Sequence, residues 1–164
     1  AWTRPTSLTD NISPDGQDMK NPDVAMSDDH TAVVVWEGSD GLKSQIFKSE
    51  YRNGAWKKPT QLSHNLSPDH SHAYAPKVAM DADGNAIIVW MQLDSGAKKQ
   101  IFKSEYRQGL WTNPTSIVNN ISPDGQDAFD PEVDMDDQGN AIIAWTQVID
   151  GITKVRHVFV SEYR

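Results

Sequence analysis

The sequence predicts an all-β protein made of β-propeller blades, with three four-stranded repeats per chain that form half of a six-bladed propeller. Three observations lead to this prediction. The phrase QIFKSEYR stands at 45–52 and again at 100–107, and SEYR returns at 161–164. Each repeat contains a nearly unbroken apolar segment of strand length. No segment shows the periodicity of an amphipathic helix.

Tryptophans mark the period of the repeat. Trp2, Trp56 and Trp111 open the three units, and a second tryptophan follows each of them after 34 residues. The text between the two tryptophans hardly changes from unit to unit, which indicates tandem duplication. We therefore expect one repeat domain over 1–164, divided into the units 1–54, 55–109 and 110–164.

The first half of each unit is expected to hold two strands and a tight turn. The first strand is placed at the Trp-Pro-Thr segment, as in 56–63. The second is placed at 77–81, with its equivalents at 23–27 and 132–136. The sequence DADGN at 81–85 then reverses the chain, because Asp and Gly tolerate the positive φ that tight hairpins require.

The second half of each unit supplies the two remaining strands. NAIIVWMQ at 85–92 is apolar at almost every position, which predicts a strand buried on both faces. In the strand that follows, uncharged side chains alternate with charged ones, as expected of a more exposed outer strand. The uncharged residues are Phe102, Ser104 and Tyr106, and the charged residues are Lys103, Glu105 and Arg107. A central strand buried on both faces fits a blade packed between two other blades. A β-trefoil and a β-prism also have three-fold repeats, and the β-trefoil is kept as the alternative.

The repeat also resembles one found in bacterial propellers of the sialidase-like and other carbohydrate-associated kinds. The resemblance rests on W..P..LS, P.VAMD..GNAI.VW and I..SEYR.G.W, which follow in that order in this chain. It implies the propeller fold and a bacterial, exported or surface protein. The Asp box of the sialidases, Ser-x-Asp-x-Gly-x-Thr-Trp, is absent from the sequence, so no activity is carried over.

Composition excludes several classes of partner. The formal net charge of −8 repels nucleic acid, and no apolar stretch reaches the roughly 18 residues of a membrane-spanning helix. The chain has no cysteine, so it forms neither disulfides nor thiolate metal sites. We expect no cofactor and no metal.

A loop with the sequence NISPDGQD stands at 11–18 and 120–127, and NLSPDHSH replaces it at 65–72. Alternating oxygen side chains before a glycine match the opening of a calcium loop, but Pro22 occupies the twelfth position, where that loop has glutamate. Ser-Pro-Asp-Gly is also a favourable type I turn, and the turn explains all three copies. The candidate ligand-binding residues of these loops are Asp15, Asp18, Asp124 and Asp127.

The middle copy of this loop carries two histidines. His70 and His72 could bind a transition metal, but only His64 and Asp69 stand nearby in the sequence, and zinc requires three or four ligands in fixed geometry. We therefore expect exposed histidines in this loop rather than a metal site.

A second candidate ligand site lies at the end of the SEYR strand. A carboxylate and an arginine stand two residues apart on one strand face, and a tryptophan follows the next turn. Lectins bind sugar hydroxyls with such polar groups and stack a sugar ring on the indole. A cross-strand ion pair with a packed tryptophan explains the same pattern. The candidate ligand-binding residues here are Glu50, Arg52, Trp56, Glu105, Arg107 and Trp111.

These patterns favour a multivalent binding module built on a propeller, with carbohydrate as the expected ligand. Catalysis has less support, because outside the repeated strand the only arginines are Arg4 and Arg156 and the repeats show little asymmetry. The alternatives are a protein-interaction scaffold and a glycoside hydrolase-type propeller. The expected partners are a glycan or protein ligand and a second copy of the chain.

The homodimer is expected from strand pairing. At the two internal junctions, SEYR runs through a short turn into Trp-Pro-Thr, so these two strands are hairpin partners. The segment 2–8 and the segment 158–164 lack such partners in the order of the chain. We expect the segment 2–8 of each chain to pair with 158–164 of the other, which closes a six-bladed ring with two-fold symmetry. The alternative is that the same contacts form within one longer chain of six repeats.

Overall fold

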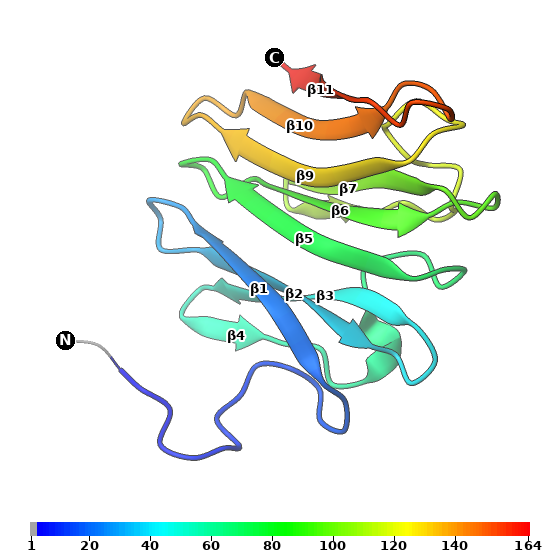
Figure 1. The fold of residues 1–164 in the computed structure, drawn as a ribbon. Helices are drawn as coiled ribbons and strands as arrows, with labels where there is room; N and C mark the ends of the chain where they lie inside the picture. The colour runs from blue at the N-terminus through cyan, green and yellow to red at the C-terminus, as the bar shows by residue number, and fades with distance from the viewer. Residues whose placement is uncertain (1–2) are drawn as a thin grey trace.

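A computed structural model describes residues 3–164, which form three antiparallel sheets, and each sheet is called a blade here (Figure 1). Blade 1 comprises β1 (Met19–Met26), β2 (Ala32–Ser39), β3 (Ser44–Arg52) and β4 (Ala55–Lys57). Blade 2 comprises β5 (Ala73–Met80), β6 (Ala86–Leu93), β7 (Lys99–Arg107) and β8 (Leu110–Thr112). Blade 3 comprises β9 (Ala128–Met135), β10 (Ala141–Val148) and β11 (Arg156–Tyr163).

The three blades are stacked through their innermost strands. Strands β1, β5 and β9 lie side by side, and the other strands of each blade follow outward in chain order (Figure 1). This arrangement confirms the prediction of an all-β protein made of propeller blades. Within residues 3–164, blades 1 and 2 have four strands and blade 3 has three. No helix in this part of the chain is long and apolar enough to cross a membrane.

The Trp-Pro-Thr segment forms a shorter strand than the sequence suggests. The strand expected over 56–63 covers only Ala55–Lys57, and a 3₁₀ turn follows at Leu62–His64. Pro59 has no backbone N–H to donate to a sheet, so the strand ends before it. This strand joins the preceding blade as the partner of β3, as the hairpin prediction requires. It therefore replaces the SEYR strand as the outermost strand of the blade.

The equivalent strand at the start of the chain was expected over 2–8. Trp2 lies outside the described residues, and residues 3–8 form no strand. They lie away from the blades in Figure 1. The Leu8 residue is almost fully exposed.

Each innermost strand is longer than expected and contains a β-bulge. The register shifts in β1 and β5 just before the prolines, where Asn21 and Ala75 have φ of 52°. Asp130 has φ of 54° at the equivalent place in β9. Positive φ is uncommon for residues with a Cβ, so the bulge is a feature built into every blade.

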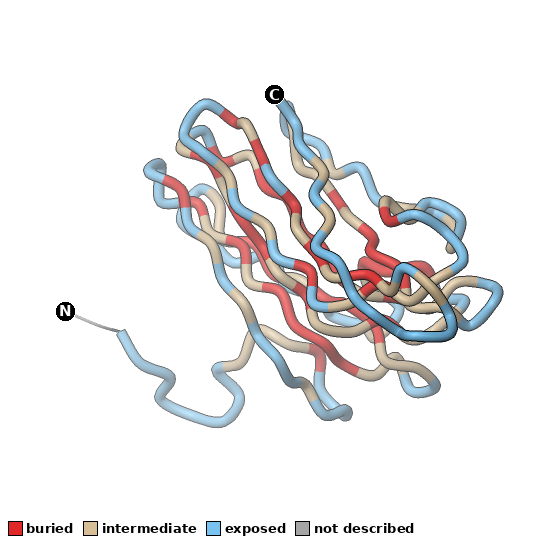
Figure 2. Tube along the Cα trace, turned by 45° about the horizontal axis from the view of Figure 1, so that its top comes forward, coloured by how far each residue is buried: buried red, intermediate tan, exposed pale blue. Residues whose placement is uncertain are grey.

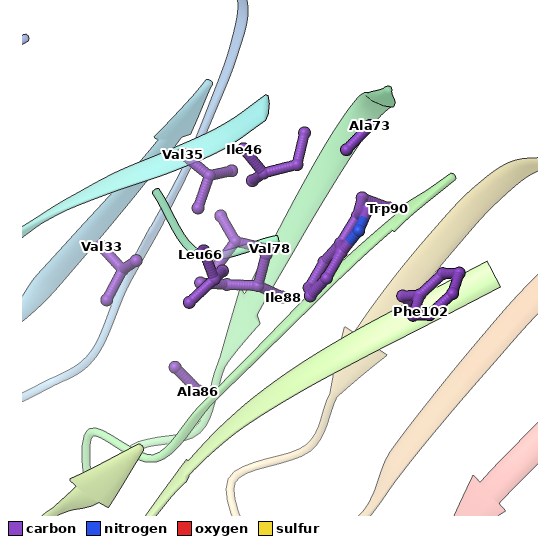
Figure 3. Packing of buried hydrophobic residues seen from close by; sticks show 10 residues of the cluster. All are labelled: Val33, Val35, Ile46, Leu66, Ala73, Val78, Ala86, Ile88, Trp90 and Phe102. Atoms are coloured by element: carbon purple, nitrogen blue, oxygen red, sulfur yellow. The ribbon is translucent and has the colours of Figure 1, made fainter. Parts of the chain in front are cut away.

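The second strand of each blade is buried on both faces where a blade lies on each side of it. In β6, Ile88 and Trp90 pack with residues of blade 1 (Figure 3), whereas Ile87 and Val89 pack with residues of blade 3. Figure 2 shows that the buried positions gather in the interior of the stacked sheets. The hairpin before β6 closes at Gly84, whose φ is +78° and whose N–H donates to the Asp81 carbonyl at 3.2 Å. The strand and the turn were both predicted correctly.

Neighbouring blades are also joined by hydrogen bonds from the Ser-Pro-Asp loops, and we call this set of contacts the interblade clip. In the first clip, the Leu66 N–H donates to the Ile46 carbonyl at 2.6 Å, and the Ile46 N–H donates to Ser67 Oγ at 3.0 Å. Ser67 Oγ also bonds to the side chain of Gln45. The second clip repeats these bonds with Gln100, Ile101, Ile121 and Ser122.

Replacing Ser67 with alanine tests the clip. Ser67→Ala leaves the buried Ile46 N–H and Gln45 Oε1 without their partner, so we expect the free energy of unfolding to fall by about 1–3 kcal/mol. Urea unfolding measures the change. Ser63→Ala, at an exposed serine of the same segment, is the control and should alter stability by less than about 0.5 kcal/mol. Equal effects of the two substitutions would contradict the role of the clip.

Candidate functional site

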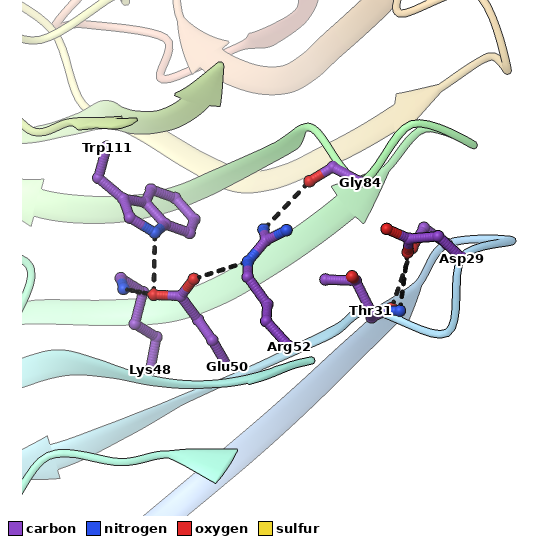
Figure 4. Close-up of polar contacts among 8 residues, drawn as sticks. Asp29, Thr31, Lys48, Glu50, Arg52, Gly84 and Trp111 are labelled. Atoms are coloured by element: carbon purple, nitrogen blue, oxygen red, sulfur yellow. Dashed lines mark hydrogen bonds and ion pairs between the residues drawn. The ribbon is translucent and has the colours of Figure 1, made fainter. Parts of the chain in front are cut away.

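The candidate site begins with Glu50, a nearly buried carboxylate on β3 between blades 1 and 2. Its Oε1 accepts hydrogen bonds from Lys48 Nζ and, at 2.9 Å, from Trp111 Nε1 (Figure 4). Its Oε2 accepts a bond from Arg52 Nε at 3.1 Å. The tryptophan belongs to blade 2 and the carboxylate to blade 1, so this arrangement is completed only where two blades meet.

Arginine side chains continue the contact toward the hairpin of the next blade. The Arg52 guanidinium lies 3.9 Å from the centre of the Tyr106 ring and donates to the Gly84 carbonyl at 3.1 Å. Arg107 repeats both contacts, with the Tyr163 ring at 4.6 Å and the Gly139 carbonyl at 3.1 Å. A Cβ at Gly139 would lie 3.0 Å from Arg107 Nη1, so a side chain there would require the arginine to move.

The electrostatics of Glu50 favour its ionised form. Burial raises the pKa of the Glu50 carboxyl. The hydrogen bond and the charge of Lys48 lower it, as do the hydrogen bonds from Arg52 and Trp111. Together these contacts outweigh burial and hold the pKa below its ordinary value. Burial lowers the pKa of Lys48, and Glu50 opposes that effect only in part. A carboxylate held in this way can accept further hydrogen bonds from a ligand.

The equivalent residue of blade 2, Glu105, has fewer partners. It pairs with Lys103 at 2.7 Å, and no indole among residues 3–164 donates to it. Arg107 Nε is buried without a hydrogen-bond partner in the same part of the chain, whereas its equivalent on Arg52 donates to Glu50. On blade 3, Arg164 Nη2 donates to Glu162 Oε2 at 2.7 Å, so the feature that distinguishes the Glu50 position among residues 3–164 is the indole bond rather than the pairing of the arginine with the carboxylate.

Two hollows with matching walls surround these carboxylates. The first has a volume of about 270 Å³, and the second has a volume of about 300 Å³. The first hollow includes Lys48, Glu50, Pro59, His64 and Leu66. The second hollow includes the residues that occupy the same repeat positions: Lys103, Glu105, Pro114, Asn119 and Ile121.

The structure pairs the predicted site residues in a different combination from the sequence. Trp56 lies opposite Tyr51 in the β3–β4 ladder, with ring centres 5.4 Å apart. Alternate residues of a strand face opposite sides, so Trp56 is on the other face from Glu50 and Arg52. The tryptophan that reaches Glu50 is Trp111, 61 residues further along the chain.

The four acidic loop residues differ in their surroundings, and only Asp124 bonds within its own loop. Asp124 accepts a bond from Asn120 at 2.9 Å, and Asp127 accepts the Lys99 N–H at 2.9 Å. Asp15 and Asp18 are exposed. His72 takes the place of Asp127 in its loop, and its Nδ1 accepts the Ser44 N–H at 3.0 Å. Within residues 3–164 no group of three or more His, Asp or Glu side chains is placed to hold a metal ion.

Sequence reasoning missed one polar cluster near the start of the innermost strands. Glu37 is buried, accepts bonds from Ser44 at 2.7 Å and Asn21 at 3.1 Å, and pairs with Lys20 at 3.0 Å. Burial raises the pKa of nearby Tyr74, and the charge of Glu37 raises it further. A comparison of repeats could have found this place, because Lys20, Tyr74 and Phe129 occupy one repeat position where the units differ.

Comparisons with known proteins agree with the fold. No protein-family model and no curated protein matches the sequence. Among solved structures, the chain is similar to a Hadza microbial sialidase, with 10% identity and a TM-score of 0.62 over 89% of this chain and 35% of the sialidase. It is also similar to an endo-arabinase from Bacteroides thetaiotaomicron, with 13% identity and a TM-score of 0.56 over 96% of this chain and 60% of the enzyme.

A thermostable family-43 glycoside hydrolase is similar at 14% identity, with a TM-score of 0.54 over 94% of this chain and 51% of that protein. The chain thus spans between about a third and three fifths of the length of these structures. At such low identity the similarity concerns the fold, and it supports the assignment of the sheets as propeller blades.

The lowered pKa of Glu50 predicts an acid dependence of stability. The unfolded carboxyl titrates near its ordinary pKa of 4.5, and the folded one titrates lower. The carboxylate therefore stabilises the fold fully above pH 4.5, and this contribution is lost as the pH falls through the lower pKa. We expect Glu50→Gln to unfold with a shallower dependence on pH below 4.5 than the wild type.

Glu105→Gln is the matched control. It removes the equivalent carboxylate of the second hollow, to which no indole among residues 3–164 donates a hydrogen bond. Thermal unfolding followed by circular dichroism from pH 3 to 7 gives both profiles. An unchanged slope in Glu50→Gln would contradict the assigned electrostatics.

Proposed function

We propose that this protein is a multivalent carbohydrate-binding module in which each ligand site lies at the junction of two propeller blades. The observation that carries the proposal is the repetition of one hollow around Glu50 and around Glu105. A repeated site with modest affinity gains strength when several copies engage one surface.

The chemistry of the hollow suits a ligand rich in hydroxyl groups. The first hollow combines the Glu50 carboxylate, three lysine side chains, the amides of Asn65 and Asn113, and the imidazole of His64. These groups supply both hydrogen-bond acceptors and donors, and Pro59 and Leu66 add an apolar wall. Its volume, at or below the lower end of the usual range for small-molecule sites, favours one or two sugar rings.

The similar solved structures agree with this ligand class. The two neighbours described above as an endo-arabinase and a family-43 glycoside hydrolase, and the sialidase, are named as carbohydrate-active proteins. Because hydrolase propellers share the fold, glycoside hydrolysis is the second candidate function, and the measurement below includes it.

We also propose that a second copy of the chain completes the propeller as a six-bladed ring. Several apolar residues on the outer faces of blades 1 and 3 are exposed, although their repeat equivalents are buried between blades. Ile142 is 52% exposed, whereas its equivalent Ile87 is 1% exposed. Val24 is 62% exposed, whereas Val78 is 7% exposed. Packing these two faces against each other would remove their apolar surface from water in both copies.

Titration with a panel of simple sugars tests carbohydrate binding. We expect at least one neutral monosaccharide or disaccharide to change the tryptophan emission in a saturable way, with more than one site per chain pair. Glu50→Gln should weaken binding at the first hollow at least tenfold, because it removes a charged acceptor.

The control is Asp28→Asn, which changes an exposed carboxylate in a hairpin turn outside both hollows. Its binding should equal that of the wild type. No emission change and no calorimetric heat with any sugar at millimolar concentration would overturn the proposal. Turnover of chromogenic glycosides would instead establish the hydrolase.

A further inference from the structure

The two outer faces of the chain carry the two halves of one interblade junction. At the junction of blades 1 and 2, Ile46 packs among Leu66, Ala73, Ile88 and Trp90 (Figure 3). At the junction of blades 2 and 3, Ile101 packs in the same way against the second set of equivalents. A protruding residue from one blade thus fills an apolar recess on the next blade.

The protruding half recurs on blade 3. Val158 on β11 occupies the repeat position of Ile46 and Ile101, which are both fully buried. Val158 is 74% exposed, and β11 is an edge strand of its sheet.

The receiving half recurs on blade 1. Ile12, Met19, Val34 and Trp36 occupy the repeat positions of Leu66, Ala73, Ile88 and Trp90. These four residues line an open, mainly apolar hollow of about 210 Å³, which we call the receiving hollow. Val158 has the type and position to fill it, as Ile46 fills its equivalent.

The polar contacts of the clip recur in the same two halves. Ile12 and Ser13 stand where Leu66 and Ser67 bond to the backbone of Ile46. Arg164 stands where Arg107 reaches the Gly139 carbonyl of the next blade. The main-chain groups of the clip and the serine hydroxyl are therefore present on blades 1 and 3, whereas His157 stands in place of the clip glutamine and His30 in place of the hairpin glycine.

Departures from the repeat on the two faces are also complementary. Trp90 and Trp145 donate to Gln92 and Gln147, but Gly38 replaces this glutamine in blade 1. A Cβ at Gly38 would lie 2.1 Å from Met19 Sδ, so methionine fills the space of the glutamine. The buried Trp36 Nε1 consequently has no hydrogen-bond partner among residues 3–164.

The missing acceptor has a counterpart on blade 3. His157 replaces the clip glutamine, Gln45 or Gln100, at the position preceding Val158. Gln45 and Gln92 both donate to the Ser71 carbonyl at 3.3 Å, so these two repeat positions meet at an interblade junction. At a junction of blade 3 with blade 1, the His157 imidazole would therefore lie near Trp36 and offer its N–H a ring-nitrogen acceptor.

The same junction would complete a ligand site. Trp56 occupies the repeat position of Trp111, and Glu162 occupies that of Glu50. Both are accessible to solvent, since the Trp56 residue is 43% exposed and the Glu162 side chain is 44% exposed. By contrast, the Glu50 side chain, which Trp111 covers, is 7% exposed. Val160 occupies the repeat position of Lys48. The Lys48 ammonium lies 4.3 Å from the centre of the Trp111 ring, whereas Val160 would give Trp56 an apolar contact at the new junction.

We propose that blade 3 of one copy packs on blade 1 of a second copy and that this contact creates a composite carbohydrate site, with Glu162 and Arg164 from one chain and Trp56 from the other. The composite site rests on the proposed carbohydrate binding. A second copy is the occupant because the protruding and receiving halves both belong to this chain. Two such contacts close a ring of six blades, which lies within the usual range for propellers.

The test uses two variants and the heterodimer that they form. Trp56→Ala and Glu162→Gln each remove one member of the composite site, so each homodimer should lose both composite sites and keep those built on Glu50 and Trp111. In a heterodimer of the two variants, purified through different tags after co-expression, one junction has both wild-type residues. We expect this heterodimer to regain one of the two lost sites in a sugar titration.

The matched control pair lies within one chain. Glu50→Gln and Trp111→Ala remove two members of the same intrachain site, so their heterodimer should regain nothing. Trp56→Phe should keep the dimer, because a phenyl ring still packs at the junction. It should lose sugar binding at the composite site, because phenylalanine has no indole N–H to donate. Light scattering before any sugar is added should give twice the 18.3 kDa mass of the chain.

Each outcome decides a defined part of the account. A monomer at micromolar concentration, or a Trp56→Ala and Glu162→Gln heterodimer that regains no site, overturns the composite site while sugar binding at Glu50 still stands. A dimer of the expected mass in which no sugar binds overturns both the composite site and the proposed function, and leaves the junction as a structural contact.

Discussion

The interblade clip is the contact on which the rest of the structure depends. The second strand of each blade is apolar on both faces, so a blade cannot bury it without another blade on each side. Packing two blades removes backbone groups of Ile46 and Ile101 from water, and the Ser-Pro-Asp loops supply the partners that these groups need. The loop that leads into one blade therefore fastens it to the blade before.

The candidate function follows from the same constraint. The carboxylate of Glu50 comes from one blade and the indole of Trp111 from the next, so the site exists only at a junction. A complete site therefore needs both a junction and the tryptophan of the fourth strand of the next blade. Glu105 lies at the junction of blades 2 and 3, but blade 3 has no fourth strand among residues 3–164, and Glu162 lies on an open face.

Much of the fold could be predicted because it depends on local patterns. The apolar segment of β6, the Asp-Gly hairpin at Gly84 and the pairing of β3 with β4 each follow from residues close together in the chain. The length of β4 was overestimated, because Pro59 ends the ladder soon after Trp56.

The candidate site was harder to predict because its members are distant in sequence. Adjacency suggested that Glu50 acts with Trp56, but strand alternation places that ring on the opposite face, and the contact is made by Trp111 instead. The β-bulges at Asn21 and Ala75 also gave no local signal, since the residue before a proline usually adopts an extended rather than a left-handed backbone.

The central claim is that blade 3 and blade 1 are two halves of a junction, and amide hydrogen exchange at Val158 tests it most directly. At the two internal junctions the equivalent N–H groups, of Ile46 and Ile101, donate to Ser67 and Ser122 at 3.0 Å and should exchange slowly. The account predicts that the Val158 amide is protected to a similar degree at high protein concentration and loses this protection on dilution. Fast exchange of Val158 at every concentration, with Ile46 and Ile101 protected, would contradict it.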